Sequence, residues 1–208
     1  MTHIFFKCAV GFLAMVAALE IAHAEENLSA EDARLEVAAY GCIRGMEHPG
    51  RTQLSFDDQL SACDTFVDLM EHDYDLMGAR RHRGTFLAEH AATAEHRNQA
   101  FEDLSFLIEN GTQRSSIFKM RAILNFRDRR DPEAALSDIT TAIELSQERM
   151  QARYFKLRAT ILIHLAQTQN DKALARRALE DVRMVRSLVS EESGMREAEK
   201  WLIDFLGE

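Results

Sequence analysis

Proline is scarce in this chain, with 2 among 208 residues, and aromatic residues make up only 8% of it. With so few helix-breaking residues, long helices are expected. The hydrophobic content of 46% is sufficient for a core built from Leu, Ala, Ile and Met. The composition therefore favours a mostly helical globular chain of one domain, or of one domain and a short extension.

Motifs for catalysis, nucleotide binding and metal binding are also missing. The sequence has no GxSxG, HExxH, P-loop, GxGxxG or CxxC pattern. His82, His90 and His96 are expected on one helix, but spacings of 8 and 6 residues do not bring all three to one face. We therefore predict that the protein is not an enzyme and that it holds neither a metal nor another cofactor.

An excess of positive charge is lacking as well, since the net charge is -9. Residues 25–78 carry 13 acidic and 3 basic side chains, a net charge of -10, whereas residues 79–208 carry 20 and 21, a net charge of +1. Nucleic acid is an unfavourable partner for such a chain, because binding to phosphates needs clustered Lys and Arg. A solvated acidic face is the simplest reading of the front half, and a partner that recognises acidic residues is the alternative.

Long apolar runs are absent except near the N-terminus. Lys7 precedes an apolar run of 12 residues, Cys8–Leu19, and Ala22-His23-Ala24 follows with the small residues of a signal-peptidase site. This run is shorter than the roughly 20 residues that span a bilayer. We predict that residues 1–24 are a signal peptide cleaved after Ala24, and that the mature chain lies in the periplasm without a membrane span. An uncleaved anchor is the alternative.

Cysteine is rare too, and only Cys42 and Cys63 remain once the signal peptide is removed. In an oxidising compartment the two are expected to pair, although two buried free thiols would also fit. Each cysteine falls on the apolar stripe of its expected helix. These stripes are Leu35, Ala38 and Cys42 in the first helix, and Phe56, Leu60, Cys63 and Val67 in the second. We therefore predict a disulfide that joins the first two helices and contributes about 3 kcal/mol.

What the sequence does contain is a series of amphipathic segments with capping residues. Ser29 and Ser55 each precede an acidic residue by three positions, Asp131-Pro132 is a helix start, and Pro49-Gly50 and Asn110-Gly111 are turns. The expected helices run from about 28 to 45–48, from 55 to an acidic connector at 71–77, and over 77–96, 98–109, 116–126, 132–145, 152–167 and 172–189, with a closing helix from Ser193.

Two linked patterns recur along these helices. Phe118-Lys119-Met120-Arg121-Ala122 returns as Phe155-Lys156-Leu157-Arg158-Ala159, and Arg83-Gly84 holds the matching place in the preceding helix. The partner helices contain an Ala, an apolar residue, a polar residue, an Asp and an aliphatic or apolar residue, beginning at Ala100, Ala135 and Ala178. We expect the small residues Gly84, Ala100, Ala122, Ala135, Ala159 and Ala178 to mark close helix approaches, with Phe118 and Phe155 filling the space toward the neighbouring helix.

These residues resemble the tetratricopeptide repeat, clearly over 78–190 and more weakly over 35–70. The first hairpin is also similar to exported bacterial repeat proteins, through Ala62-Cys63-Asp64. The chain departs from the repeat pattern at Arg80, where an aromatic residue is usual, and no Pro closes a repeat. The resemblance implies an all-α array of antiparallel helical hairpins, an α-solenoid with a C-terminal capping helix. Its expected parts are a hairpin over 25–76 and repeats with the capping helix over 77–208.

Three arginines recur in register, and they are the candidate contacts of the groove that such an array implies. Arg83, Arg121 and Arg158 would bind a carboxylate or an acidic peptide there. Alternatively, each pairs with an acidic residue of its own repeat, such as Asp103 or Asp138, and we favour this second reading.

The function that the sequence predicts is a non-catalytic periplasmic scaffold, which binds an unidentified protein or peptide in its concave groove. The alternative is a helical accessory domain, or a small enzyme of a cell-envelope system, whose site has no recognisable motif.

Overall fold

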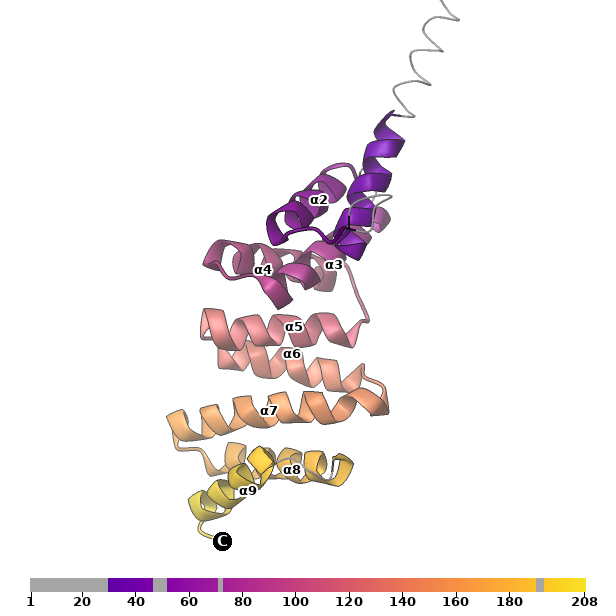
Figure 1. The fold of residues 1–208 in the computed structure, drawn as a ribbon. Helices are drawn as coiled ribbons and strands as arrows, with labels where there is room; N and C mark the ends of the chain where they lie inside the picture. The colour runs from indigo at the N-terminus through magenta and orange to yellow at the C-terminus, as the bar shows by residue number, and fades with distance from the viewer. Residues whose placement is uncertain (1–29, 47–51, 71–72, 190–192) are drawn as a thin grey trace, which may run out of the picture. The chain divides into compact units, whose positions relative to one another are not determined.

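The computed structural model describes residues 30–46, 52–70, 73–189 and 193–208, and its regular structure is helical throughout those ranges (Figure 1). The expected signal peptide, the expected cap Ser29 and the expected turn at Pro49-Gly50 lie outside the described residues. A helix covers residues 30–44. The elements that follow are α2 (Phe56–Asp68), α3 (Asp73–His90), α4 (Ala94–Glu109), α5 (Ser115–Leu124), the π-helical η1 (Asn125–Arg129), α6 (Pro132–Glu144), α7 (Glu148–Gln169), α8 (Lys172–Leu188) and α9 (Ser193–Leu206).

Within the described residues the predicted fold class is confirmed: successive helices form four antiparallel hairpins, followed by one closing helix. The contacts between Cα atoms divide the chain into two compact units, one ending at Ala79 and the other beginning at Arg80. The division falls inside α3, so each unit is described separately below.

In the second unit, every helix packs on the next one along the chain from α4 to α9. The repeated small residues are buried at these contacts, with Ala100, Ala122, Ala135, Ala159 and Ala178 fully inaccessible to solvent. Phe118 and Phe155 are partly buried against the cores formed by α5–α7 and α7–α9. The alanines therefore allow the helices to approach, while the phenylalanines occupy the space beside them.

The closing helix α9 covers the apolar face of α8. Met195, Leu202 and Leu206 are buried with Val182 and other residues of α8 in one cluster. Trp201 and Phe205 stack at a ring-centroid distance of 5.0 Å on the partly buried side of α9. This arrangement ends the array with a helix that buries the apolar surface of the last hairpin, as a repeat array requires.

Both ends of α3 differ from the sequence prediction. It begins at Asp73, so residues 73–77 of the expected acidic connector are helical. It ends at His90 rather than near 96, and α4 begins at Ala94 rather than near 98, where the Thr93 side chain caps it by accepting a hydrogen bond from His96 N. His96 thus lies on α4 rather than beside His82 and His90. The guanidinium of Arg97 donates to the carbonyl of Ala92 at 2.6 Å and so satisfies the backbone just beyond α3. Thr93 therefore sets the start of α4, while Arg97 satisfies a carbonyl in the connection between α3 and α4.

Candidate functional site

The three arginines of the repeated pattern all donate two hydrogen bonds to one aspartate of the partner helix in their own hairpin. Arg83 bonds to Asp103 at 2.7 and 2.9 Å, Arg121 to Asp138 at 2.9 and 2.7 Å, and Arg158 to Asp181 at 2.7 Å for both bonds. In each pair Nε and Nη2 of the guanidinium face the two carboxylate oxygens, which is the fork geometry that makes such pairs strong.

Burial makes these pairs structural elements of the hairpins. Asp103, Asp138 and Asp181 are only 1%, 4% and 4% exposed, so each carboxylate depends on arginine for charge compensation. Asp103 has Arg80 at 3.5 Å in addition to Arg83. The hydrogen bonds to Asp181 raise the pKa of Arg158 against the opposing effect of burial. Since the positive charge of each arginine already faces a carboxylate, Arg83, Arg121 and Arg158 offer little net attraction to an acidic ligand. A contact between these arginines and a ligand stays a prediction.

The middle pair has two further partners that the sequence did not indicate. Asn125, buried in the first turn of η1, donates to Asp138 at 3.0 Å. Arg121 also donates to the Ser105 hydroxyl of α4 at 3.3 Å. A π-helical turn places Asn125 toward Asp138, and η1 ends at Arg130 in the left-handed conformation. The sequence pattern that pointed to the three arginines was an Arg followed by a small residue on one helix, and Ala-x-x-Asp on its partner helix. Neither Asn125 nor Ser105 belongs to this pattern.

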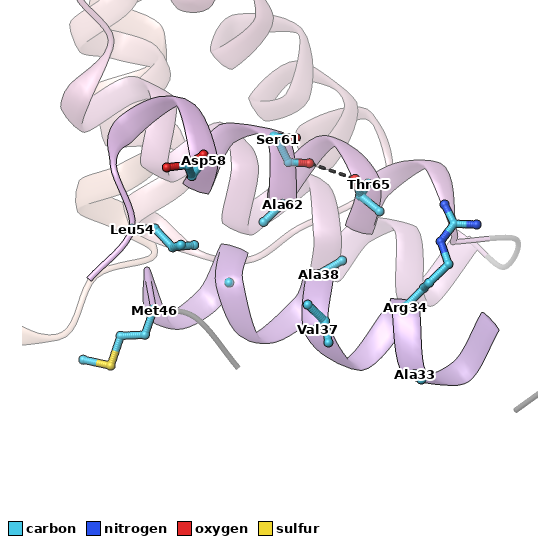
Figure 2. A pocket seen from close by; sticks show the side chains of 11 residues that line it. Ala33, Arg34, Val37, Ala38, Met46, Leu54, Asp58, Ser61, Ala62 and Thr65 are labelled. Carbon is cyan, nitrogen blue, oxygen red and sulfur yellow. Dashed lines mark hydrogen bonds between the residues drawn. The ribbon is translucent and has the colours of Figure 1, made fainter. Parts of the chain in front are cut away.

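The first unit contains a different feature, an open groove between the helix over 30–44 and α2 (Figure 2). We call it the N-terminal groove. It has a volume of about 800 Å³ and is lined by Ala33, Arg34, Val37, Ala38, Gly41, Met46, Leu54, Asp58, Ser61, Ala62 and Thr65. Most of its lining is therefore small or apolar, with a few polar groups. In Figure 2, Arg34 lies at one end of the groove and Asp58 at the other.

The floor of the N-terminal groove is a close approach between two helices. A Cβ atom added at Gly41 would lie 2.9 Å from Ala62 Cβ, so glycine is needed at this position for the helices to meet. The next residue of each helix is a cysteine, and Cys42 and Cys63 form the predicted disulfide with a Cα separation of 4.5 Å. Gln59 adds a hydrogen bond to the carbonyl of Cys42 at 3.0 Å. A covalent crosslink thus holds the two groove walls together.

Apolar side chains remain accessible along the N-terminal groove. Val37 is 50% exposed and Met46 is 39% exposed. The sequence reasoning missed this surface because it followed the stripe of Leu35, Ala38 and Cys42, which packs the hairpin, and Val37 lies off that stripe. An apolar residue outside the expected core stripe of an amphipathic helix was the available signal.

Within the described ranges, no group of His, Cys, Asp and Glu side chains is arranged to hold a metal ion. His82 lies half-buried beside Arg81, whose guanidinium is 3.2 Å from the imidazole Nε2. Burial lowers the pKa of His82, and the charges of Arg81 and Arg114 lower it further. None of the helices described is long and apolar enough to cross a membrane.

The comparisons with known proteins identify the fold. No protein-family model matches the sequence, and no curated protein matches it. Two solved structures of tetratricopeptide-repeat proteins resemble the chain. The crystal structure of MamA protein superposes with a TM-score of 0.63 over 85% of this chain and 82% of that one, at 13% sequence identity. The chain has a tetratricopeptide-like fold.

The second structure is described as "YrrB: a TPR protein with an unusual peptide-binding site". It covers 74% of this chain and 79% of its own, at 13% identity and a TM-score of 0.46. The fold assignment rests on the superposition with MamA protein and on the hairpins themselves. At this level of identity the likeness concerns the fold alone.

Proposed function

We propose that this protein is a periplasmic interaction scaffold that binds a protein or peptide and catalyses no reaction. The observation that carries the proposal is the N-terminal groove, an open trough with accessible apolar side chains on a hairpin held by a disulfide. Grooves between helices are a recurrent way to bind a peptide segment. The repeat fold supports the same reading, because stacked hairpins present extended surfaces to partners.

The periplasmic location is supported by the N-terminal sequence and by the Cys42–Cys63 disulfide, which persists in oxidising compartments. Expression of the precursor in a Gram-negative host should yield a periplasmic protein that begins at Glu25. N-terminal sequencing checks this. Intact Met1 in the cytoplasmic fraction would contradict the location and remove the reason to expect the disulfide.

The interaction role is tested by affinity capture with the mature chain, residues 25–208, as bait in an envelope extract. The wild type, Val37→Lys and Ile43→Lys are compared. Val37 and Ile43 are both exposed β-branched residues of one helix, at 50% and 46%, but only Val37 lines the N-terminal groove. A partner should be enriched by the wild type and by Ile43→Lys, and lost with Val37→Lys. If none of the three baits enriches a protein, the scaffold proposal is wrong.

A further inference from the structure

The N-terminal groove has features that restrict what kind of segment it can accept. From Ala33 to Gly41 its wall extends over nine residues of helix, about 12 Å, or roughly two turns. The lining contains residues with small side chains or none, namely Ala33, Ala38, Gly41 and Ala62. Because these residues project little into the groove, the backbone of a bound helix can approach closely. Val37 and Met46 then provide accessible apolar contacts. The shape therefore suits a short helix that presents an apolar stripe to the groove.

The charge of the hairpin restricts the partner further. Residues 30–46 and 52–70 together carry seven acidic side chains and two basic ones, a net charge of -5. Asp57 and Asp58 stand exposed in the first turn of α2, and Asp58 lines the groove itself. α2 contains no basic residue. A segment that enters the groove meets an apolar surface with Asp58 at one end and Arg34 at the other, on a hairpin whose net charge is negative.

We infer that the N-terminal groove binds an amphipathic helix of a partner protein, whose apolar stripe is flanked by Lys or Arg. This inference rests on the proposed function and names the class of partner. The apolar stripe packs between the helix over 30–44 and α2, and the flanking basic residues face the acidic side chains of the hairpin. Opposite charges speed the encounter and select the partner, while apolar burial supplies affinity.

The same charge disfavours the other occupants of an apolar groove. A second copy of the chain would bring its own hairpin, of net charge -5, against this one, and like charges repel. The anionic surface of a phospholipid membrane is disfavoured for the same reason. A basic amphipathic helix is the occupant that satisfies both the apolar lining and the charge.

The test uses two synthetic 14-residue helical peptides labelled with fluorescein. Both carry leucines on one face, and the other positions are Lys in the first peptide and Glu in the second. Fluorescence anisotropy with the mature, oxidised chain should show binding of the Leu/Lys peptide, at least tenfold tighter than that of the Leu/Glu peptide. The affinity should fall as NaCl is raised from 0.05 to 0.5 M, because the charges are screened.

Matched variants separate binding in the groove from general charge attraction. Val37→Lys should reduce the affinity for the Leu/Lys peptide about tenfold or more. Ile43→Lys adds the same charge outside the groove and should reduce this affinity less than threefold. Asp58→Asn should likewise weaken binding more than Asp57→Asn, since only Asp58 lines the groove. Circular dichroism and mass spectrometry of each variant check the helices and the disulfide.

The outcomes distinguish this inference from the scaffold role. Equal effects of Val37→Lys and Ile43→Lys on peptide binding, or tighter binding of the Leu/Glu peptide, would overturn the inference. If the envelope partner is still lost with Val37→Lys in that case, the scaffold proposal stands with a different partner class. If no envelope protein is captured by any bait, the scaffold proposal fails whatever the peptides do.

Discussion

The hairpin formed by residues 30–44 and α2 is joined by a covalent bond, whereas the hairpins that follow are joined by buried arginine–aspartate pairs. Both devices sit beside a close helix approach. Gly41 meets Ala62 next to the Cys42–Cys63 disulfide, and Gly84 meets Asp103 next to Arg83. At both glycines an added Cβ would lie 2.9 Å from the facing Cβ. A close helix approach is therefore secured by different chemistry in the two hairpins.

This difference has physical consequences. An arginine–aspartate pair fixes the register of two helices, since a shift would leave a buried carboxylate without its partner. A disulfide needs no buried charge, and it makes the stability of its hairpin depend on the redox state. The N-terminal groove lies on the covalently joined hairpin, so the disulfide keeps its two walls together.

The largest effect is expected when one partner of a buried pair is removed. Arg158→Ala leaves the Asp181 carboxylate buried and uncompensated, and should lower the free energy of unfolding by about 3–5 kcal/mol in urea titrations. Arg153→Ala, at an exposed position of the same helix, should change it by less than about 0.5 kcal/mol.

A double variant sharpens this test. Arg158→Met with Asp181→Leu removes both charges and should recover most of the loss, because well-packed apolar residues often replace a buried pair without cost. If Arg158→Ala is as stable as the wild type but no longer binds the captured partner, the arginine is a ligand contact and the row of paired arginines is not a structural device.

The next largest effect concerns the disulfide. Cys42→Ser with Cys63→Ser should destabilise the first hairpin by about 3 kcal/mol, since the bond closes a loop over a sequence separation of 21. Hydrogen exchange should show earlier opening of residues 30–70 than of 80–208. Simultaneous opening of both regions in the variant would mean that the disulfide and the arginine–aspartate pairs do not stabilise their hairpins independently.

A smaller effect is expected at the two close approaches. Gly41→Ala and Gly84→Ala each place a Cβ 2.9 Å from a facing Cβ, and should destabilise the chain by about 1–3 kcal/mol in thermal unfolding. Gly78→Ala is the matched control, because Gly78 is helical and no atom lies within 4 Å of its added Cβ. The free energy of unfolding of the Gly78→Ala variant should rise by about 0.5–1 kcal/mol, because alanine has a higher helix propensity than glycine. Stabilisation by all three substitutions would contradict the close approaches.

The smallest effect is a pH dependence of stability that comes from His82, a residue of the second unit. His82 has a lowered pKa in the folded chain, so the unfolded state binds its proton first as the pH falls. Stability from this residue is present above the unfolded pKa of about 6.5 and decreases as the pH falls from there toward the folded pKa. His82→Gln should reduce the slope of unfolding free energy against pH in this window. An unchanged slope would show that His82 contributes none of it.

Much of the fold follows from the sequence, because its signals act over short distances. The apolar periodicity predicted the helices, and Ser55 and Asp131 cap α2 and α6 as their positions indicated. The boundary expected near residue 97 lies at 91–93, and its cause is also local: Thr93 caps α4 and Arg97 reaches back to the Ala92 carbonyl, contacts that apolar periodicity does not reveal.

The sequence by itself determined the helical repeat and indicated the disulfide, since Cys42 and Cys63 fall on the apolar stripes of two successive helices. Tertiary structure decided the rest. It pairs Arg83, Arg121 and Arg158 with aspartates 17 to 23 residues away, where the sequence allowed either a ligand or a partner. It also leaves an unfilled trough beside Val37. Both depend on how closely two helices approach and which faces they turn to each other, and the pattern within one helix does not contain that information.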